Sequence, residues 1–420
     1  MNLVIKKDGL LEKIILLLML LQIMIVRWMD LSLYFSYIVI ALFLVHLFCN
    51  YKKYFRMKLT MLSSLIFLAY FWINTVTNGG SKDIGIMNFK MIAPSIFMLL
   101  FVSYILRYRI EVVREFVNNS IWFLNLYYII NVPVLLLELN GNIALAGKHP
   151  PEAFNTMFED MISGLLGYNG TPVLALFCAF MTIINMYKLG NMKNSWRKNL
   201  YCLYIILISG FMLWISTKND NKSVILIVFL FVIAYLFFAY NNKINRLHWK
   251  KIMNVLKYAL IVTVVTFVSY NLLMQIDMFN SIITKIFDRI NEGISLGSKA
   301  AGSAERIGGV VAILSDIPHR MLGYGLGKYT WRQGNAFGFF HFGQNDLSAF
   351  LFIGGMLFVV LLLWLVYVSF NSIRKSMMHS VVLLAIFLIL LLYTQVLTEV
   401  SSMYIYLYFV ILCYLKIETS

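Results

Sequence analysis

Charged residues are scarce in this sequence. They make up 13% of its 420 residues, while hydrophobic residues make up 61%. A water-soluble domain has about 25% charged and about 45–50% apolar residues. Apolar runs long enough to cross a bilayer recur along the chain, whereas the short alternating strands of a membrane β-barrel do not. The composition therefore argues against a soluble protein and predicts an all-α polytopic membrane protein.

Cysteine is also rare, and the sites that cysteines usually build are missing. The chain has four cysteines, and none has the Cys-x-x-Cys spacing of a metal site or a disulfide framework. The sequence contains no P-loop, no Rossmann fingerprint and no Asp-x-Asp cluster. We therefore expect neither a bound metal nor a cofactor.

Acidic residues are few beside basic ones, and the net charge is +16. No RNA- or DNA-binding module accompanies this charge, so we expect no nucleic-acid partner. Most lysines and arginines occupy short segments between apolar runs, as the positive-inside rule describes for cytoplasmic loops. The charge distribution is thus a topology signal, and the partner that it indicates is the lipid bilayer.

The apolar runs predict about twelve membrane spans. With the N-terminus inside, alternate loops such as 52–58 and 107–114 carry the cationic residues, so both termini are expected in the cytoplasm. The predicted spans are 11–26, 31–49, 59–76, 91–106, 119–138, 171–187, 200–216, 224–240, 258–275, 346–370, 380–397 and 402–415.

The chain is predicted to be one integral membrane domain, 1–420, with two long outer loops at 139–170 and 276–345. Residues 281–293 of the second loop have apolar side chains at helical spacing, which predicts an interfacial helix. Gly293 to Gly302 is small and polar, and we expect a flexible linker there. Ser303 is the expected N-cap of a further short helix before span 346–370, and Pro318 ends that helix.

The second outer loop is rich in cationic side chains, although it is predicted outside. Topology tolerates charge in long loops but does not explain it. An anionic ligand at the outer face would explain it. Because no ATP is present there, a substrate must bring its own leaving group, as a lipid pyrophosphate does. Arginine holds phosphate oxygens bidentately, and transfer to a hydroxyl also needs a base or an orienting group.

Four segments of the sequence resemble the O-antigen polymerase and ligase superfamily. They are ISGLLGYNGTPVLALF, STKNDNKSVILIVFLF, ERIGGVVAILSDIPHRMLGYGLG and QNDLSAFLFIGG. The segments occur in the order of the family and at matching topological places, over about residues 155–360. The resemblance implies a GT-C-like membrane glycosyltransferase that acts on polyprenyl-pyrophosphate-linked sugars at the outer face of the bacterial cytoplasmic membrane.

The resemblance also implies roles for individual residues. Arg306 and Lys222 would hold the pyrophosphate, and Asn345 would orient a substrate group. The sequence departs from the family pattern in that the family's histidine falls on Gln344, with His341 one helical turn away.

The candidate site residues all lie at the predicted outer face. Candidates for acid–base or orienting chemistry are His341, Asp346 and Asn345. Candidates for holding the pyrophosphate are Arg306, Lys222, Arg320 and Lys218. Candidates for other substrate contacts are Gln344 and Tyr324.

Each candidate has a purely structural alternative. Asn345 or Asp346 could simply cap the helix that begins there, and His341 could be an interfacial ring bonded to backbone. Lys218 and Lys222 could anchor to lipid headgroups. The glycines of the Gly-x-Gly-x-Gly segment are expected to make turns, although their N–H groups could also cradle an anion.

The function predicted from these patterns is polymerisation of polyprenyl-pyrophosphate-linked oligosaccharide repeat units into a surface polysaccharide. A chain-length regulator is a possible protein partner. Two alternatives remain open at the level of sequence: a ligase that transfers finished glycan to another acceptor, and a flippase or other transporter of lipid-linked oligosaccharide. A flippase should carry cationic residues within its spans, whereas here they concentrate in one outer loop.

Overall fold

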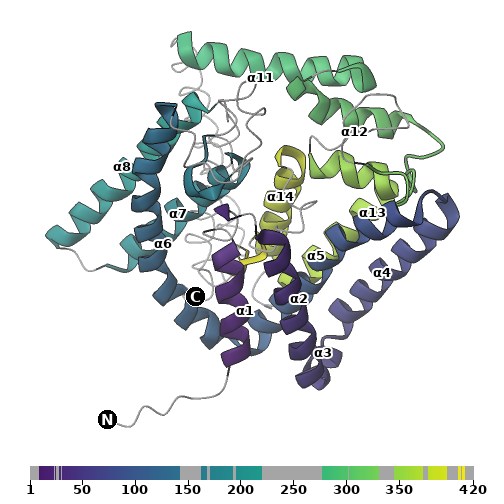
Figure 1. Cartoon of the computed structure of the whole chain (residues 1–420), viewed down its shortest axis with the longest axis horizontal. Coiled ribbons are helices and arrows are strands. Elements are labelled where there is room, and N and C mark those ends of the chain that lie inside the picture. Colours follow the sequence, from purple (N-terminus) through teal and green to yellow (C-terminus); the bar gives the residue numbers. More distant parts are fainter. Residues whose placement is uncertain are drawn as a thin grey trace, which may run out of the picture.

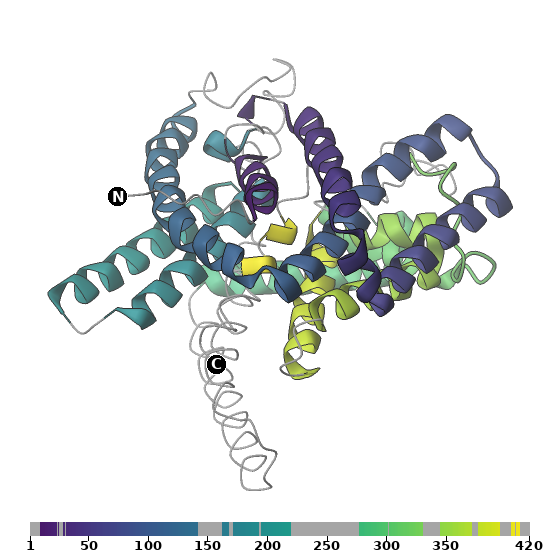
Figure 2. The same ribbon diagram turned by 90° about the horizontal axis from the view of Figure 1, so that it is seen from below.

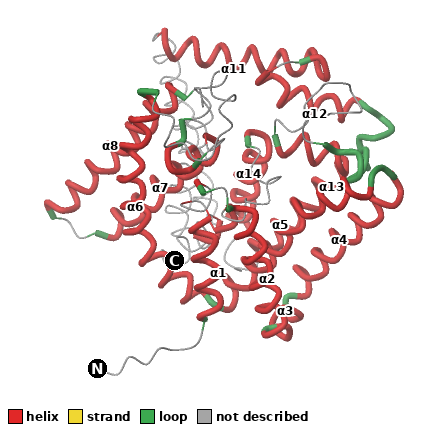
Figure 3. The backbone as a smooth tube through the Cα atoms, viewed as in Figure 1, coloured by secondary structure: helices red, strands yellow, loops and turns green. Residues whose placement is uncertain are grey.

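The described part of the protein is almost entirely helical (Figure 3). A computed structural model describes residues 9–22, 24, 28–29, 31–141, 162–167, 171–192, 195–219, 277–300, 302–330, 345–371, 377–394, 405–407 and 409–411. These residues form no β-strand; the one extended pairing among them is an isolated bridge between Gly80 and Gly327.

The described helices follow one another along the chain in this order. The N-terminal half contains α1 (Leu10–Leu21), α2 (Ser32–Cys49), α3 (Tyr51–Arg56), α4 (Lys58–Asn78), α5 (Lys82–Tyr108), α6 (Ile110–Leu139), the 3-10 turn η5 (Gly164–Leu166), α7 (Thr171–Asn191) and α8 (Trp196–Lys218). The C-terminal half contains α11 (Asp277–Leu296), η6 (Gly297–Lys299), η7 (Gly302–Ala304), α12 (Glu305–Ser315), α13 (Asp346–Asn371) and α14 (Met377–Tyr393).

Six of the described helices are long and apolar enough to cross a membrane. They lie at Lys58–Asn78, Lys82–Tyr108, Ile110–Leu139, Val173–Gly190, Trp196–Ser216 and Asp346–Asn371. Shorter apolar helices occur at Tyr34–Cys49 and Leu383–Leu392. The expectation of an all-α membrane protein is confirmed at this level. The predicted spans 224–240 and 258–275 lie outside the described residues, as does most of 402–415.

The helices form two groups that the N-terminal helices join. In Figure 1, α6, α7 and α8 lie on the left, and the α4–α5 hairpin lies on the right against α13, with α1, α2 and α14 between them. The view from below in Figure 2 shows the same division. Helix α13 packs against α4, α5, α12 and α14, so the α4–α5 hairpin and the second outer loop share one scaffold.

Helix α13 is broken within its predicted span. The span predicted at 346–370 is found as the apolar helix Asp346–Asn371, but Gly355, with a φ of 67°, interrupts it. Residues before and after this point form two helical pieces that run in different directions (Figure 1). A helix break inside a membrane leaves N–H and C=O groups that the rest of the protein must satisfy.

The linker predicted at Gly293–Gly302 is also corrected. Helix α11 continues to Leu296, and Gly293 lies inside it where α11 crosses the start of α12. A Cβ atom on Gly293 would lie only 2.7 Å from the carbonyl oxygen of Ala304, so this glycine permits a close helix crossing. Ser303 is not the N-cap either; it belongs to η7, and Ala304 precedes the first residue of α12.

Candidate functional site

The Gly-x-Gly-x-Gly turn of the second outer loop fills the break in α13. The N–H of Tyr324 donates to the Phe352 carbonyl at 2.7 Å, and that of Gly325 donates to the Ile353 carbonyl at 3.0 Å. Beyond the break, the N–H of Met356 donates to the carbonyl of Arg320 at 2.8 Å. The loop thus satisfies backbone groups on both sides of Gly355, which is what a broken helix requires.

The α4–α5 hairpin holds this loop from the other side. The Asn74 amide donates to the Leu322 carbonyl at 2.8 Å, and the Tyr70 hydroxyl donates to the Gly354 carbonyl. The Asn88 amide donates to two loop carbonyls, those of Leu326 at 2.6 Å and Tyr329 at 2.8 Å. Asn74 and Asn88 therefore fix the loop against the α4–α5 hairpin, and Tyr70 fixes α13 at its break.

The glycines of the turn are needed for close packing. Gly323 has a φ of 70°, and a Cβ atom there would lie 2.6 Å from the backbone nitrogen of Gly354. Gly325 has a φ of 101°, and its Cβ atom would lie 2.5 Å from the Cβ of Asn78. The N–H groups of Tyr324 and Gly325 point to protein carbonyls. The turn role is confirmed, and these two N–H groups are not arranged to cradle an anion.

Asn345 ties the beginning of α13 to the beginning of α12. Its amide nitrogen donates to the Arg306 carbonyl at 2.8 Å and to the Leu392 carbonyl at 2.9 Å. Its Oδ1 accepts the N–H of Ser348 at 2.7 Å, which is the bond of an N-cap residue. Asn345 is fully buried. The capping alternative is therefore confirmed for Asn345, and its amide also joins two of the four family-like segments.

Asp346 lies beneath the surface. It is fully buried, its N–H donates to the Thr394 carbonyl at 2.9 Å, and its Oδ2 lies 3.5 Å from the Thr394 hydroxyl. The neighbouring Tyr329 is 2% exposed, and burial, together with the charge of Asp346, raises the pKa of its phenol. The carboxylate of Asp346 is thus placed to organise this interior rather than to meet a bulky substrate directly.

Arg306 and Arg320 flank α12 at opposite ends. Arg306 lies in its first turn and is half-buried, whereas Arg320 follows its last turn and is exposed. The 11 residues of α12 span about 16 Å at 1.5 Å per residue. The two arginines therefore mark the two ends of one surface rather than a single point.

A second polar cluster, which the sequence analysis did not single out, surrounds Tyr324. We call Asp316, His319 and Tyr324 the loop cluster. The Nδ1 atom of His319 lies 2.9 Å from Oδ2 of Asp316, and the Tyr324 hydroxyl donates to the same oxygen. The His319 and Tyr324 rings stack at 4.0 Å between centroids. Burial, and then the bond to Asp316, raises the pKa of Tyr324.

The other two family-like segments meet at the ends of α6 and α8. The Glu138 carboxylate accepts the N–H groups of Ser163 at 3.0 Å and Gly164 at 2.7 Å. The Asn219 amide donates to the Ile162 carbonyl at 3.2 Å. Lys218, next to Asn219, is exposed. Lys222, His341 and Gln344 lie outside the described residues.

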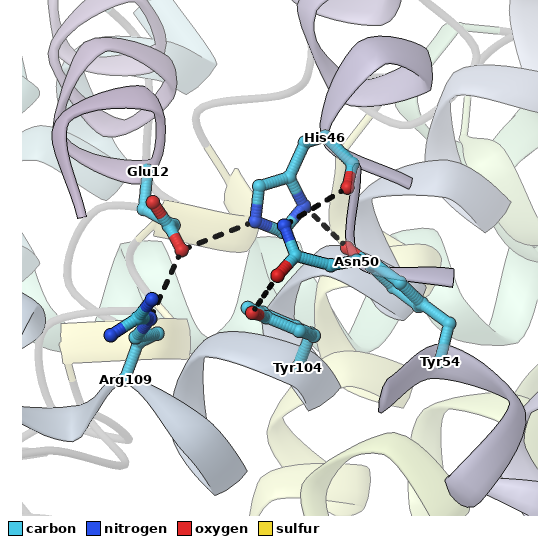
Figure 4. A network of polar contacts seen from close by, with 6 residues as sticks. All are labelled: Glu12, His46, Asn50, Tyr54, Tyr104 and Arg109. Carbon is cyan, nitrogen blue, oxygen red and sulfur yellow. Dashed lines mark hydrogen bonds and ion pairs between the residues drawn. The ribbon is translucent and has the colours of Figure 1, made fainter. Parts of the chain in front are cut away.

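A buried charged network, also missed by the sequence analysis, lies at the opposite end of α4 (Figure 4). Oε1 of Glu12 lies 3.2 Å from Nε2 of His46 and 3.3 Å from Nε of Arg109. Nδ1 of His46 lies 3.0 Å from the Tyr54 hydroxyl. The Tyr104 hydroxyl donates to Asn50, whose amide bonds the His46 carbonyl. We call Glu12, His46, Asn50, Tyr54, Tyr104 and Arg109 the buried network.

Comparisons with known proteins add no relative. No protein-family model matches the sequence, and no curated protein is significantly similar to it.

Proposed function

We propose that this protein is a membrane glycosyltransferase that polymerises polyprenyl-pyrophosphate-linked oligosaccharide repeat units. It would act at the outer face of a bacterial cytoplasmic membrane, with about twelve spans, a GT-C-like arrangement and both termini in the cytoplasm. The polymer would leave the donor lipid and join the non-reducing end of the next lipid-linked repeat. A chain-length regulator would be its protein partner.

The observation that carries the proposal is the junction at Asn345. Its amide holds the carbonyl of Arg306, so the cationic first turn of α12 and the start of α13 are held together. A cation in the first turn of a helix gains nothing from the helix dipole, which favours a ligand-binding reason for Arg306. The junction is buried and tied to Leu392, so the position of Arg306 is set by the scaffold.

In this proposal Arg306 and Lys222 hold the diphosphate of the donor. The bond between the anomeric carbon and the diphosphate oxygen breaks, and its electron pair leaves with the diphosphate. The acceptor hydroxyl oxygen bonds to the anomeric carbon and loses its proton to a base. Fixed guanidinium groups stabilise the negative charge that develops on the leaving group, as preorganised donors do in other active sites.

The test uses purified full-length protein in lipid nanodiscs with one lipid-linked repeat as its only sugar substrate. Wild-type protein should make a ladder of polymers, and Arg306→Ala should make none while remaining folded. Arg289→Ala is the matched control, since Arg289 is an exposed arginine of the same loop that pairs with Glu292. Product only after addition of a second type of acceptor would mean a ligase. A full ladder from Arg306→Ala would remove the basis of the proposal.

A further inference from the structure

His319 is the one histidine on the predicted outer side that the structure describes. The chain has six histidines, and His46 is the other with described contacts to a carboxylate. The side chain of His319 is 39% exposed, and Asp316 beside it is 21% exposed. A histidine that is both oriented and open to solvent has the arrangement that proton transfer to or from a substrate requires.

The neighbours of His319 fix its tautomer and its plane. With Nδ1 donating to the Asp316 carboxylate, Nε2 carries the lone pair and can accept a proton. Among the residues described, Nε2 has no hydrogen-bond partner. The Tyr324 ring stacks on the imidazole, and the Phe352 ring stacks on Tyr324 at 4.9 Å. A carboxylate that orients a histidine in this way also stabilises the imidazolium formed when the histidine takes a proton.

We propose that His319, oriented by Asp316, is the general base that takes the proton of the acceptor hydroxyl. This inference rests on the glycosyl transfer proposed above and names its base. As the acceptor oxygen bonds to the anomeric carbon, its proton moves to Nε2 of His319, and the diphosphate leaves with the electron pair of the broken bond. Asp316 is a positioning residue, because it touches His319 and not the substrate.

The alternative described group is less suited to this step. Asp346 is fully buried and bonded to Thr394, so a sugar hydroxyl cannot approach its carboxylate without opening the fold. Arg320, by contrast, follows His319 directly and is exposed, with no ion pair among the described residues. It places a permanent positive charge beside the proposed base, where an anionic lipid-linked substrate would be attracted.

Arg306 and His319 lie near the two ends of α12. Arg306 is in its first turn, and His319 lies four residues beyond its last residue, Ser315. In this proposal the diphosphate leaves on the Arg306 side, and the acceptor hydroxyl gives up its proton on the His319 side.

The experiment compares His319→Asn, Asp316→Asn and Met321→Ala with wild type in the nanodisc assay. Polymerisation by His319→Asn should fall by about 10²–10⁴-fold, the usual contribution of a general base. Its binding of the lipid-linked repeat, measured by native mass spectrometry, should be unchanged. Met321→Ala is the surface control from the same loop, because Met321 is 51% exposed, and its activity should stay at the wild-type level.

Binding and turnover, measured separately, distinguish catalysis from a merely structural role. Asp316→Asn should lower the rate of polymerisation and leave binding of the lipid-linked repeat unchanged, because the amide can still accept the Nδ1 proton but has no charge to stabilise the imidazolium. A wild-type rate in Asp316→Asn, or polymer from His319→Asn at more than about a tenth of the wild-type rate, would overturn the assignment of the base. A wild-type protein that makes no polymer would instead refute the proposed function itself.

Discussion

The part of the chain that the structure describes contains two histidine–carboxylate pairs, and they differ in how many of the ring nitrogens have a partner. In the buried network, His46 is fully buried, with Nε2 3.2 Å from Glu12 and Nδ1 3.0 Å from the Tyr54 hydroxyl. In the loop cluster, Asp316 contacts Nδ1 of His319, the Tyr324 ring stacks on the face of the imidazole, and Nε2 has no partner among the described residues. Both clusters thus combine a histidine, a carboxylate and a tyrosine. Both ring nitrogens of the histidine have contacts in the buried network, whereas one is available in the loop cluster.

The two regions lie at opposite ends of α4, whose 21 residues extend about 30 Å. The buried network joins the starts or ends of several helices that the sequence places at the cytoplasmic side. The loop cluster joins a loop to the break in α13. We therefore expect chemistry at the His319 pair, which leaves one ring nitrogen available, whereas the His46 pair, with contacts at both ring nitrogens, joins helices.

The largest effect is expected when a charge is removed from the buried network. Arg109→Ala leaves the Glu12 carboxylate, which is 4% exposed, with only His46 to balance it. The loss of one partner of a buried pair costs about 3–5 kcal/mol, and the lower value applies because Arg109 is 27% exposed. Reversible SDS unfolding in mixed micelles measures this loss.

A double variant distinguishes this cause from general damage to α5. Glu12→Gln together with Arg109→Ala removes the buried charge as well as its partner, so it should recover most of the lost stability. If the double variant is no more stable than Arg109→Ala, the charge of Glu12 is not the reason. If Arg109→Ala unfolds like wild type, the network does not join these helices at all.

The second prediction concerns the break in α13 that supports the loop cluster. Gly355→Ala should cost about 2–3 kcal/mol, because φ is positive there and the new Cβ would come closer than 3.0 Å to the backbone of Met321. Gly79→Ala is the matched control, since Gly79 also has a positive φ of 64° but nothing within 4 Å of its Cβ. Equal losses for the two variants would show that backbone conformation, and not packing of the loop, sets the cost.

The sequence predicts the helices well and their interruptions poorly. Composition and apolar runs place α2, α4, α7, α8 and α14 within four residues of the observed bounds, whereas α5 and α6 each begin nine residues before their predicted spans. The break at Gly355 escapes such an analysis because the apolar run continues through it. A glycine is needed at position 355 because the carbonyl of Met321 packs against it. Met321 is distant in sequence, and only folding brings the two residues together.

The residues of the candidate site also fall into two sets, those that the sequence singles out and those that only the structure reveals. The family resemblance singles out Arg306 and Asn345, and Asp346 is singled out by its place at the start of a predicted span; the structure shows that Asn345 joins α12 and α13. Asp316 and His319 were missed although they are three residues apart, because the turn that brings their side chains together lies beyond the end of the predicted helix. The members of the buried network come from helices spread over about a hundred residues, so no local pattern could reveal them.

A third prediction concerns the bonds that attach the loop to α5. The variant removes these bonds and leaves Asp316, His319 and Tyr324 unchanged. Asn88→Ala leaves the buried carbonyls of Leu326 and Tyr329 without their donor, which should cost about 1–3 kcal/mol. Amide hydrogen exchange should become faster in residues 322–330, and it should change less in α4 and α5. Asn125→Ala, which removes an amide bonded to Asn185 on the other side of the molecule, should leave exchange in this loop unchanged. Unaltered exchange in Asn88→Ala would mean that the loop is held by other contacts.

The smallest expected effect is on the stability of the His319 variant. The pair with Asp316 is partly exposed, and such ion pairs contribute about 0–1 kcal/mol, so His319→Ala should unfold almost like wild type. His46→Ala should be clearly less stable, because it removes a fully buried ring from between Glu12 and Tyr54. If His319→Ala proves as unstable as His46→Ala, the loop cluster is closed by contacts of its own, and the distinction between the two pairs fails. If the stabilities separate as expected, any loss of polymer in the His319 variant belongs to the reaction and not to the fold.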